Sequence, residues 1–200
     1  MCQRVKCLMW KPPPVRKRPM PRAHPVLGRR HFLAGAGASL FVPRLALAST
    51  PDVRWLAFDN IHTGEKLKVE YWAEGQYVQD ALAQVNHVLR DFRSGDVHPI
   101  APRLLDLISV LRARLETTEP VSVISGYRSP KTNAMLRGEH EHSGVASKSL
   151  HMQGMAIDIR IAGRSLAALH TAALAQRVGG VGYYPQSDFV HVDVGRIRHW

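Results

Sequence analysis

The 200-residue sequence predicts an α+β domain in which helices pack on a small, mainly antiparallel sheet. Stretches with apolar residues at helical spacing and short alternating segments succeed one another, separated by polar or Gly-rich breaks. About 150 residues follow a distinctive N-terminus, which is an ordinary size for one domain. We therefore expect one folded domain over residues 49–200 and an N-terminal extension over residues 1–48.

The first half of the domain predicts a hairpin followed by two helices. Residues 55–58 and 67–71 alternate between apolar and polar side chains, and His62-Thr63-Gly64-Glu65 between them is typical of a turn. Apolar residues recur at helical spacing over 77–92 and again over 99–115, where a proline opens the stretch.

The second half predicts short strands that alternate with two helices. A polar loop over 138–149 divides this half, and a Gly-Gly pair ends the last helix. The expected elements are a strand over 121–125, a short helix over 129–136, a strand over 155–161, a helix over 165–178 and a closing hairpin of 181–184 and 189–194.

The N-terminal extension has the layout of a twin-arginine export signal. Arg29-Arg30 precedes a modest apolar run rich in Ala and Gly, which ends at the small-x-small sequence Ala46-Leu47-Ala48. The run is too short for a stable membrane span, so we expect no permanent membrane anchor. We predict export by the twin-arginine machinery, removal of the signal near Ala48 and a periplasmic location. Met20 is an alternative start to Met1.

The charge distribution argues against a nucleic-acid partner. The formal net charge is +11, but ten of the 27 Lys and Arg side chains and none of the 16 acids lie in residues 1–48, which leaves a net charge of +1 for the rest. Both cysteines, Cys2 and Cys7, also lie in the extension. A metal in the domain would therefore be held by His and carboxylate side chains.

The strongest functional signal is the string Ser149-x-His151-x-x-Gly154-x-Ala156-x-Asp158. The glycine lets the chain turn into the strand that follows. Ala156 and Asp158 share a face of that strand because side chains alternate, and the small alanine leaves room beside the carboxylate. A carboxylate within an apolar strand needs a partner, which favours a metal.

A candidate metal site combines this string with the final strand. His151, Asp158 and His191 supply two imidazoles and one carboxylate, and the open fourth position of such a set is typical of catalytic zinc. This donor set suits Zn²⁺ better than Mg²⁺ or Ca²⁺. His140 and His142 lie in the polar loop, where we expect them to be solvated or to face a substrate.

At these residues the sequence resembles the LAS group of zinc D-Ala-D-Ala peptidases, whose fold is shared with the Hedgehog N-terminal domain. Within that group it is most similar to the twin-arginine-exported murein endopeptidase K type. The resemblance covers residues 52–200 and implies a Hedgehog/DD-peptidase-like fold. It also implies that a turn over 125–129 directs Arg128 toward the substrate. The metal ligands that it implies are His151, Asp158 and His191.

The expected chemistry needs a base and a cation beside the zinc. Zinc would lower the pKa of a bound water and polarise the peptide carbonyl, while a carboxylate takes the proton. The family usually places a Glu three residues before its last His ligand, and Asp188 occupies that position here, so we assign it the base role. Asp193 is the alternative, either as base or as a residue that orients His191, and Ser149 is a further candidate for such support. Arg128 could hold a substrate carboxylate or stabilise the oxyanion.

We predict a zinc metallopeptidase that hydrolyses the peptide cross-links of peptidoglycan, with murein peptides as its substrates. A D,D- or L,D-carboxypeptidase is one alternative, although the rather short chain lacks obvious insertions that would close one end of a cleft. A noncatalytic, zinc-containing module that binds the cell wall is another. Asp188 and Arg128 favour the enzyme.

Overall fold

The computed structural model of the protein describes residues 52–138 and 145–200. The predictions that concern the export signal, its cleavage site and the two loop histidines His140 and His142 lie outside the described residues. Among the described residues, no helix is long and apolar enough to cross a membrane.

The first strands form the predicted hairpin. β1 (Arg54–Asn60) pairs with β2 (Lys66–Ala73) in antiparallel register, and the short β3 (Gln76–Tyr77) extends the sheet beyond β2. Asn60 closes the turn, because its side-chain oxygen accepts hydrogen bonds from two backbone N–H groups of the turn. Its side-chain amide also donates to the backbone carbonyl of Val88. The hairpin is thus joined to the helix that follows it.

The two helices that follow are both shorter than predicted. α1 (Gln79–Val88) is capped by Leu89, whose carbonyl oxygen accepts a hydrogen bond from a later segment, so the helix does not continue to residue 92. α2 (Pro102–Arg114) begins three residues after the expected Pro99. The residue before a proline avoids helical geometry, and Ala101 accordingly is extended, with φ −60° and ψ 120°.

The remaining predicted elements form within a few residues of their expected bounds. They are β4 (Val121–Ser125), α3 (Pro130–Gly138), β5 (Ala156–Ile161), α4 (Leu166–Gln176), β6 (Gly180–Tyr184) and β7 (Phe189–Asp193). Four short elements were not predicted, namely the strands β3 and β8 (Arg198–His199) and the 3-10 helices η1 (Leu150–Gln153) and η2 (Pro185–Ser187). Two to four residues are too few to show a period.

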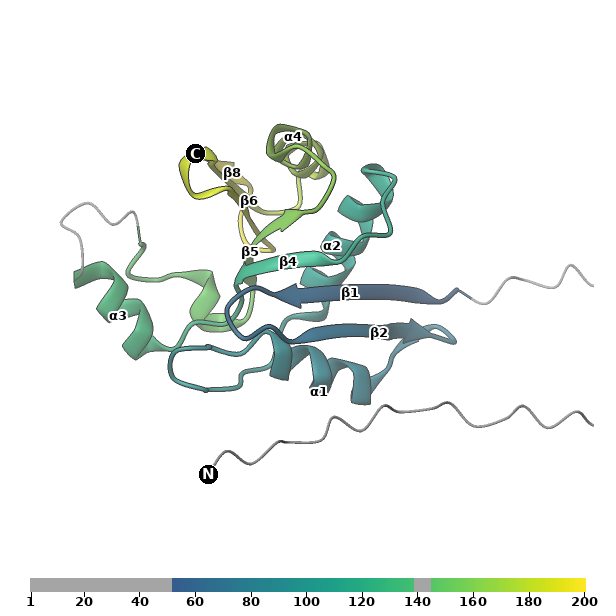
Figure 1. The fold of residues 1–200 in the computed structure, drawn as a ribbon, viewed down its shortest axis with the longest axis horizontal. Coiled ribbons are helices and arrows are strands. Elements are labelled where there is room, and N and C mark those ends of the chain that lie inside the picture. Colours follow the sequence, from purple (N-terminus) through teal and green to yellow (C-terminus); the bar gives the residue numbers. More distant parts are fainter. Residues whose placement is uncertain (1–51, 139–144) are drawn as a thin grey trace, which may run out of the picture. The chain divides into compact units, whose positions relative to one another are not determined.

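The described strands form one sheet in the order β3-β2-β1-β4-β5-β7-β6-β8. The pairs β1 with β4 and β6 with β8 are parallel, and the other pairs are antiparallel. α1 packs against β2, α2 against β1, and α4 against β5, β6 and β7 (Figure 1). The predicted α+β class with a mainly antiparallel sheet is confirmed.

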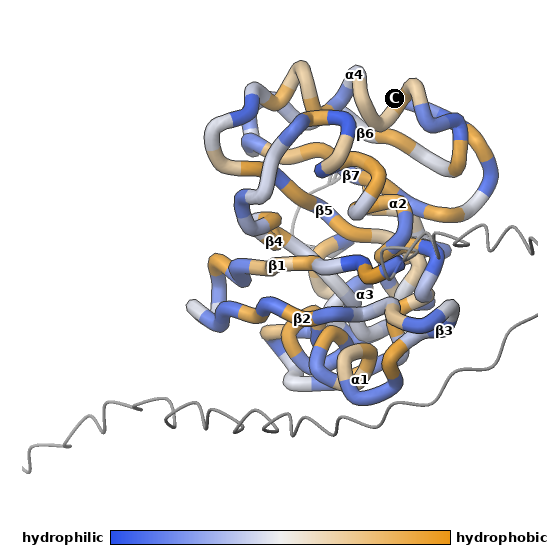
Figure 2. The backbone as a smooth tube through the Cα atoms, turned by 90° about the vertical axis from the view of Figure 1, so that its right-hand side faces the viewer, coloured by the Kyte–Doolittle hydropathy of each residue, from blue (hydrophilic) through white to orange (hydrophobic). Residues whose placement is uncertain are grey.

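One face of the sheet supplies the hydrophobic core together with α1, α2 and α4. Hydrophobic segments run along β5 and β7 in Figure 2. Each buried aliphatic side chain contributes about 1.5–3 kcal/mol relative to exposure. The core residues of the central strands are Leu56, Phe58, Val121, Val123, Ile157, Ile159, Val190 and Val192.

The opposite face of the central strands carries polar and small residues. Asp158 of β5 is paired with His191 of β7 on one side and with Ser125 of β4 on the other. Gly182 of β6 extends this row beyond His191. Because neighbours along a strand point to opposite faces, the row lies on the face away from the core. The sheet thus separates the packing residues from the candidate site.

Candidate metal centre

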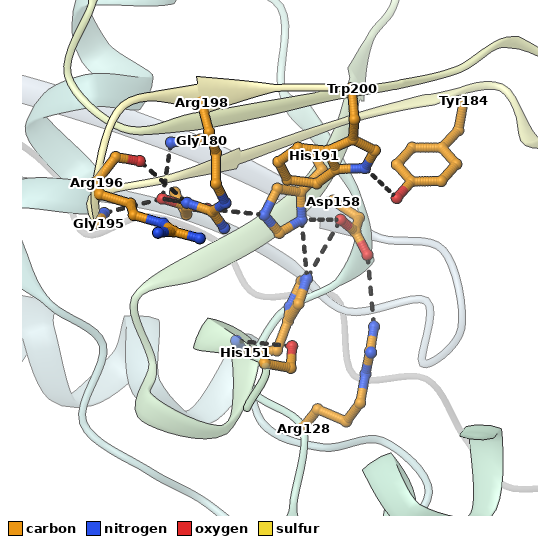
Figure 3. A network of polar contacts seen from close by, with 12 residues as sticks. Arg128, His151, Asp158, Gly180, Tyr184, His191, Gly195, Arg196, Arg198 and Trp200 are labelled. Carbon is orange, nitrogen blue, oxygen red and sulfur yellow. Dashed lines mark hydrogen bonds and ion pairs between the residues drawn. The ribbon is translucent and has the colours of Figure 1, made fainter. Parts of the chain in front are cut away.

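Three buried side chains from separate elements converge at this row. His151 comes from η1, Asp158 from β5 and His191 from β7, and one donor atom of each lies within 4.8 Å of the other two (Figure 3). Asp158 Oδ1 lies 2.8 Å from His191 Nδ1 and 3.3 Å from His151 Nε2, and the two ring nitrogens are 3.2 Å apart. The three residues predicted as ligands are therefore brought together.

In each ring, the outer nitrogen, which points away from the cluster, contacts an acceptor, and the inner nitrogen points into the cluster. His151 Nδ1 lies 2.8 Å from the carbonyl oxygen of Gly126, and His191 Nε2 lies 3.2 Å from Asp193 Oδ2. When both imidazoles are neutral and donate these outer N–H groups, their inner nitrogens present lone pairs to a metal. Burial lowers the pKa of His191, but hydrogen bonding to Asp158 and Asp193 raises it above its ordinary value, so the cluster attracts a positive charge. A cation satisfies this arrangement.

The donor set and its spacing fit a divalent transition metal. Atoms about 2.0–2.2 Å from a tetrahedral zinc ion lie roughly 3.3 Å apart, close to the three distances between the donor atoms of His151, Asp158 and His191. Two nitrogens and one oxygen suit zinc better than the oxygen-rich sets of Ca²⁺ or Mg²⁺. Three protein ligands leave a fourth position for water or substrate.

The string that predicted the site also explains how His151 is placed. The Ser149 hydroxyl caps η1 by accepting a hydrogen bond from the His151 backbone N–H at 3.3 Å. Gly154 ends η1 in the left-handed region, with φ 65°, and a Cβ there would lie 2.1 Å from the Pro99 carbonyl oxygen. The Gly154 carbonyl accepts a hydrogen bond from Ala101 at 2.9 Å. Ser149 thus supports the ligand through the backbone.

Arg128 lies against the outer oxygen of the ligand carboxylate. Its Nη2 is 3.6 Å from Asp158 Oδ2 and 3.3 Å from the Ser125 hydroxyl, and its side chain is mostly buried. Burial lowers the pKa of the Arg128 guanidinium. Burial alone would raise the pKa of Asp158, but the adjacent His151 and His191 lower it below its ordinary value. The cluster therefore keeps an ionised carboxylate next to a fixed cation.

A buried acid outside the predicted site anchors the turn that holds Arg128. Asp91 Oδ2 accepts a hydrogen bond from the Ser129 backbone N–H at 2.9 Å. Burial would raise the pKa of Asp91, but hydrogen bonds from Thr132 and Ser129 lower it to about 2. This role was not predicted, because Asp91 lies at the expected end of a helix, where an acid is usually solvated.

The two candidate bases occupy very different places. Asp193 is fully buried behind His191, on the side of the ring away from the cluster. Asp188 follows η2 with φ 53°, its side chain is 62% exposed, and its Oδ2 lies 2.7 Å from Arg160 Nη1. The structure therefore does not bring Asp188 into the cluster, and its placement gives no support to the assigned base role.

The cluster opens on a pocket of about 410 Å³. The described residues that line it include cations and aromatic rings but no carboxylate. The Trp200 indole N–H donates to the Tyr184 hydroxyl at 2.6 Å, and the Tyr184 and Phe189 rings stack with centroids 4.6 Å apart. The lining residues outside the metal cluster include Arg128, Lys148, Tyr184, Phe189, Arg198 and Trp200.

Sequence reasoning missed the aromatic wall formed by Tyr184, Phe189 and Trp200. Its only signal was the spacing of Arg198 and Trp200, which would place both side chains on one side of an extended segment. The strand β8 is two residues long, so the alternation could not be distinguished from chance.

Comparison with known proteins gives the family. Residues 48–200 match the family model described as Peptidoglycan L,D-endopeptidase MepK. The peptidoglycan L,D-endopeptidase MepK of Escherichia coli (strain K12) is 45% identical over 177 residues, covering 86% of this chain and 96% of that protein. The probable peptidoglycan L,D-endopeptidase MepK of Haemophilus influenzae is 42% identical over 157 residues, covering 78% and 83%. The resemblance predicted from the sequence is confirmed, and the chain belongs to the MepK family of peptidoglycan L,D-endopeptidases.

Proposed function

We propose that this protein is a zinc-dependent murein endopeptidase that hydrolyses L,D peptide cross-links of peptidoglycan. The proposal rests on one observation above all, the buried cluster of His151, Asp158 and His191 that opens on the pocket. The names of the relatives support the substrate class and the type of bond.

In this proposal, zinc is held by His151 Nε2, Asp158 Oδ1 and His191 Nδ1. When bound, zinc would supply Lewis-acid chemistry, polarising a peptide carbonyl and lowering the pKa of a water molecule. The Gly126 carbonyl and Asp193 contact the outer ring nitrogens and so orient both rings toward the metal position.

Arg128 has the best position for charge stabilisation in the described part of the pocket. Its guanidinium is mostly buried, so its field acts with little solvent screening. A cation there can hold the negative charge that develops on the scissile carbonyl oxygen, or a carboxylate of the murein peptide. Ser125 and Asp158 fix its orientation.

The aromatic wall gives the substrate an apolar surface beside the metal ligands. The Trp200 ring lies 5.3 Å from the His191 ring between centroids, and Tyr184 is hydrogen-bonded to it. Such a wall suits the aliphatic side chains of a cross-linked peptide. A carboxypeptidase on murein peptides remains the alternative enzyme, and a zinc-containing wall-binding module the alternative without catalysis.

We further propose that the protein is exported by the twin-arginine route, loses residues 1–48 and acts in the periplasm. The Arg29-Arg30 pair and the sequence Ala46-Leu47-Ala48 support the route and the cleavage site. Peptidoglycan lies outside the cytoplasm, so a substrate of this kind requires export.

The test is incubation of the protein with purified cross-linked murein, with and without a chelator, followed by chromatography of the released peptides. We expect cross-linked dimers to fall and uncross-linked peptides to rise, with loss of activity on chelation and recovery when zinc is added. Release of a terminal amino acid without loss of cross-links would identify a carboxypeptidase. Unchanged murein with zinc-loaded protein would support the wall-binding module.

A further inference from the structure

We propose that Arg198 is a positioning residue for the metal ligand His191 and that it acts through Asp193. This inference rests on the proposed metal site. Arg198 belongs to the two-residue strand β8 and lines the pocket, but its guanidinium is directed at Asp193. Figure 3 shows Arg198 on the opposite side of His191 from Arg128.

Asp193 is held by donors on each of its oxygens. Oδ1 accepts the backbone N–H groups of Gly180 and Gly195, both at 2.8 Å. Oδ2 lies 2.6 Å from Arg198 Nη2 and 3.2 Å from His191 Nε2. The backbone therefore fixes one oxygen of the carboxylate, and Arg198 fixes the oxygen that accepts the imidazole N–H.

Arg198 is also the charge that permits a buried carboxylate at this position. The Asp193 side chain is fully buried, and an unpaired ionised carboxylate there would be strongly unfavourable. A planar guanidinium can contact both oxygens at once, and Nη1 lies 3.3 Å from Oδ1. The Arg198 ion pair thus keeps Asp193 available as a hydrogen-bond acceptor for His191.

The neighbouring strand leaves space for this ion pair. Gly180 of β6 is paired with Arg198 in parallel register. A Cβ at Gly180 would lie 2.4 Å from Asp193 Oδ2 and 2.5 Å from Arg198 Nη1, so any other residue would push the two groups apart. Gly180, which belongs to the Gly-Gly pair that predicted a helix end, therefore also leaves room for the ion pair between Arg198 and Asp193.

Trp200 limits the access of water to this ion pair. The Arg198 guanidinium lies 5.1 Å from the Trp200 ring centroid, and the same ring lies beside His191. Partial exclusion of solvent strengthens the pairing of Arg198 with Asp193. The C-terminal segment formed by β8 and Trp200 therefore supplies both the cation behind His191 and part of the pocket wall in front of it.

The test is a double-mutant cycle on zinc affinity, measured by competition with a chelator on the purified full chain. The variants are D193N, R198Q, R198K and the double variant D193N/R198Q, with R196Q as the matched control because Arg196 is exposed and its side chain lies outside the pocket lining. Thermal unfolding of each metal-free variant reports whether it folds.

We expect R198Q to weaken zinc binding by roughly 10–100-fold, the usual effect of losing a group that orients a ligand. If Arg198 acts through Asp193, the double variant binds zinc no more weakly than D193N alone. R198K retains the charge but not the planar fork, so its affinity should fall between those of the wild type and R198Q. R196Q should match the wild type.

The inference is overturned if R198Q binds zinc as tightly as the wild type, or if the losses in D193N and R198Q multiply in the double variant. Should R198Q fail to fold, R198K decides, and wild-type affinity in R198K would contradict the inference. If the wild type and R198Q bind zinc equally well, this inference is wrong but the proposed function is unaffected. A wild-type protein that binds no zinc contradicts both.

Discussion

At the scale of single residues, an acceptor beside the outer nitrogen orients each ligand ring. His151 directs Nε2 inward because its Nδ1 lies beside the Gly126 carbonyl, and His191 directs Nδ1 inward because its Nε2 lies beside Asp193. A metal bound here leaves the N–H of each ring on that outer nitrogen. The opposite tautomers of the two rings follow from where each acceptor lies. A metal therefore meets three aligned donor atoms without having to reorient them.

The placement of the two candidate bases gives the first prediction. Asp188→Asn should keep its zinc and most of its murein hydrolysis, because Asp188 bonds Arg160 at the surface. Asp193→Asn should weaken zinc binding by roughly 10–100-fold, because it loses the acceptor that orients His191. Zinc content and hydrolysis rate, measured for both variants, check this.

Loss of activity in Asp188→Asn would instead support Asp188 as the general base. Loss of a general base costs roughly 10²–10⁴-fold in rate and leaves the metal bound. If Asp188→Asn loses activity by this factor with its zinc retained, the family-based assignment of Asp188 as base is right, and its contact with Arg160 must open during the reaction.

At the scale of elements, the sequence predicted most of the sheet and every long helix. Helical spacing and alternation sufficed for elements of five residues or more, and the string around His151 predicted three ligands that the structure brings together. Prediction was poorest where a position depends on distant contacts. α1 ends early at a carbonyl that a later turn uses, and β8 is a strand only because β6 lies beside it.

The turn that holds Arg128 gives a pH prediction. Asp91 has a pKa of about 2 in the folded protein against 3.8 ordinarily, so folding favours its ionised form. The ionised Asp91 contributes on the order of 2 kcal/mol to the free energy of unfolding above pH 4, and this contribution is lost as the pH falls through 2. Urea unfolding across this range should show wild-type stability falling more steeply with acid than that of Asp91→Asn.

A matched comparison isolates this effect from other acids. Asp158 and Asp193 also have lowered pKa values, but they are present in both proteins and their contributions cancel in the difference. Parallel stability curves for the wild type and Asp91→Asn would show that Asp91 does not anchor the turn through its charge.

At the scale of the whole molecule, positive charge and folded domain lie in different parts of the chain. The excess of positive charge lies in residues 1–48, whereas residues 52–200 contain the sheet and the metal cluster. The two faces of the central strands have different roles: one packs against helices, and the other carries the metal ligands Asp158 and His191.

The proposed export signal gives a prediction that sequencing can check. The exported protein should begin near Ser49, and replacing Arg29 and Arg30 by Lys should block its export, because the twin-arginine machinery reads this pair. N-terminal sequencing of periplasmic protein, together with fractionation of the variant, measures both. A mature start well upstream of Ser49, or continued export of the Lys variant, would point to a different route.

The central claim is that His151, Asp158 and His191 hold one metal ion, and elemental analysis of purified protein tests it most directly. We expect about one zinc per chain in the wild type and in the control His87→Ala, whose ring is exposed on α1. His151→Ala should lose stoichiometric zinc, because one of three protein ligands is gone. Stoichiometric zinc retained in His151→Ala would contradict the account.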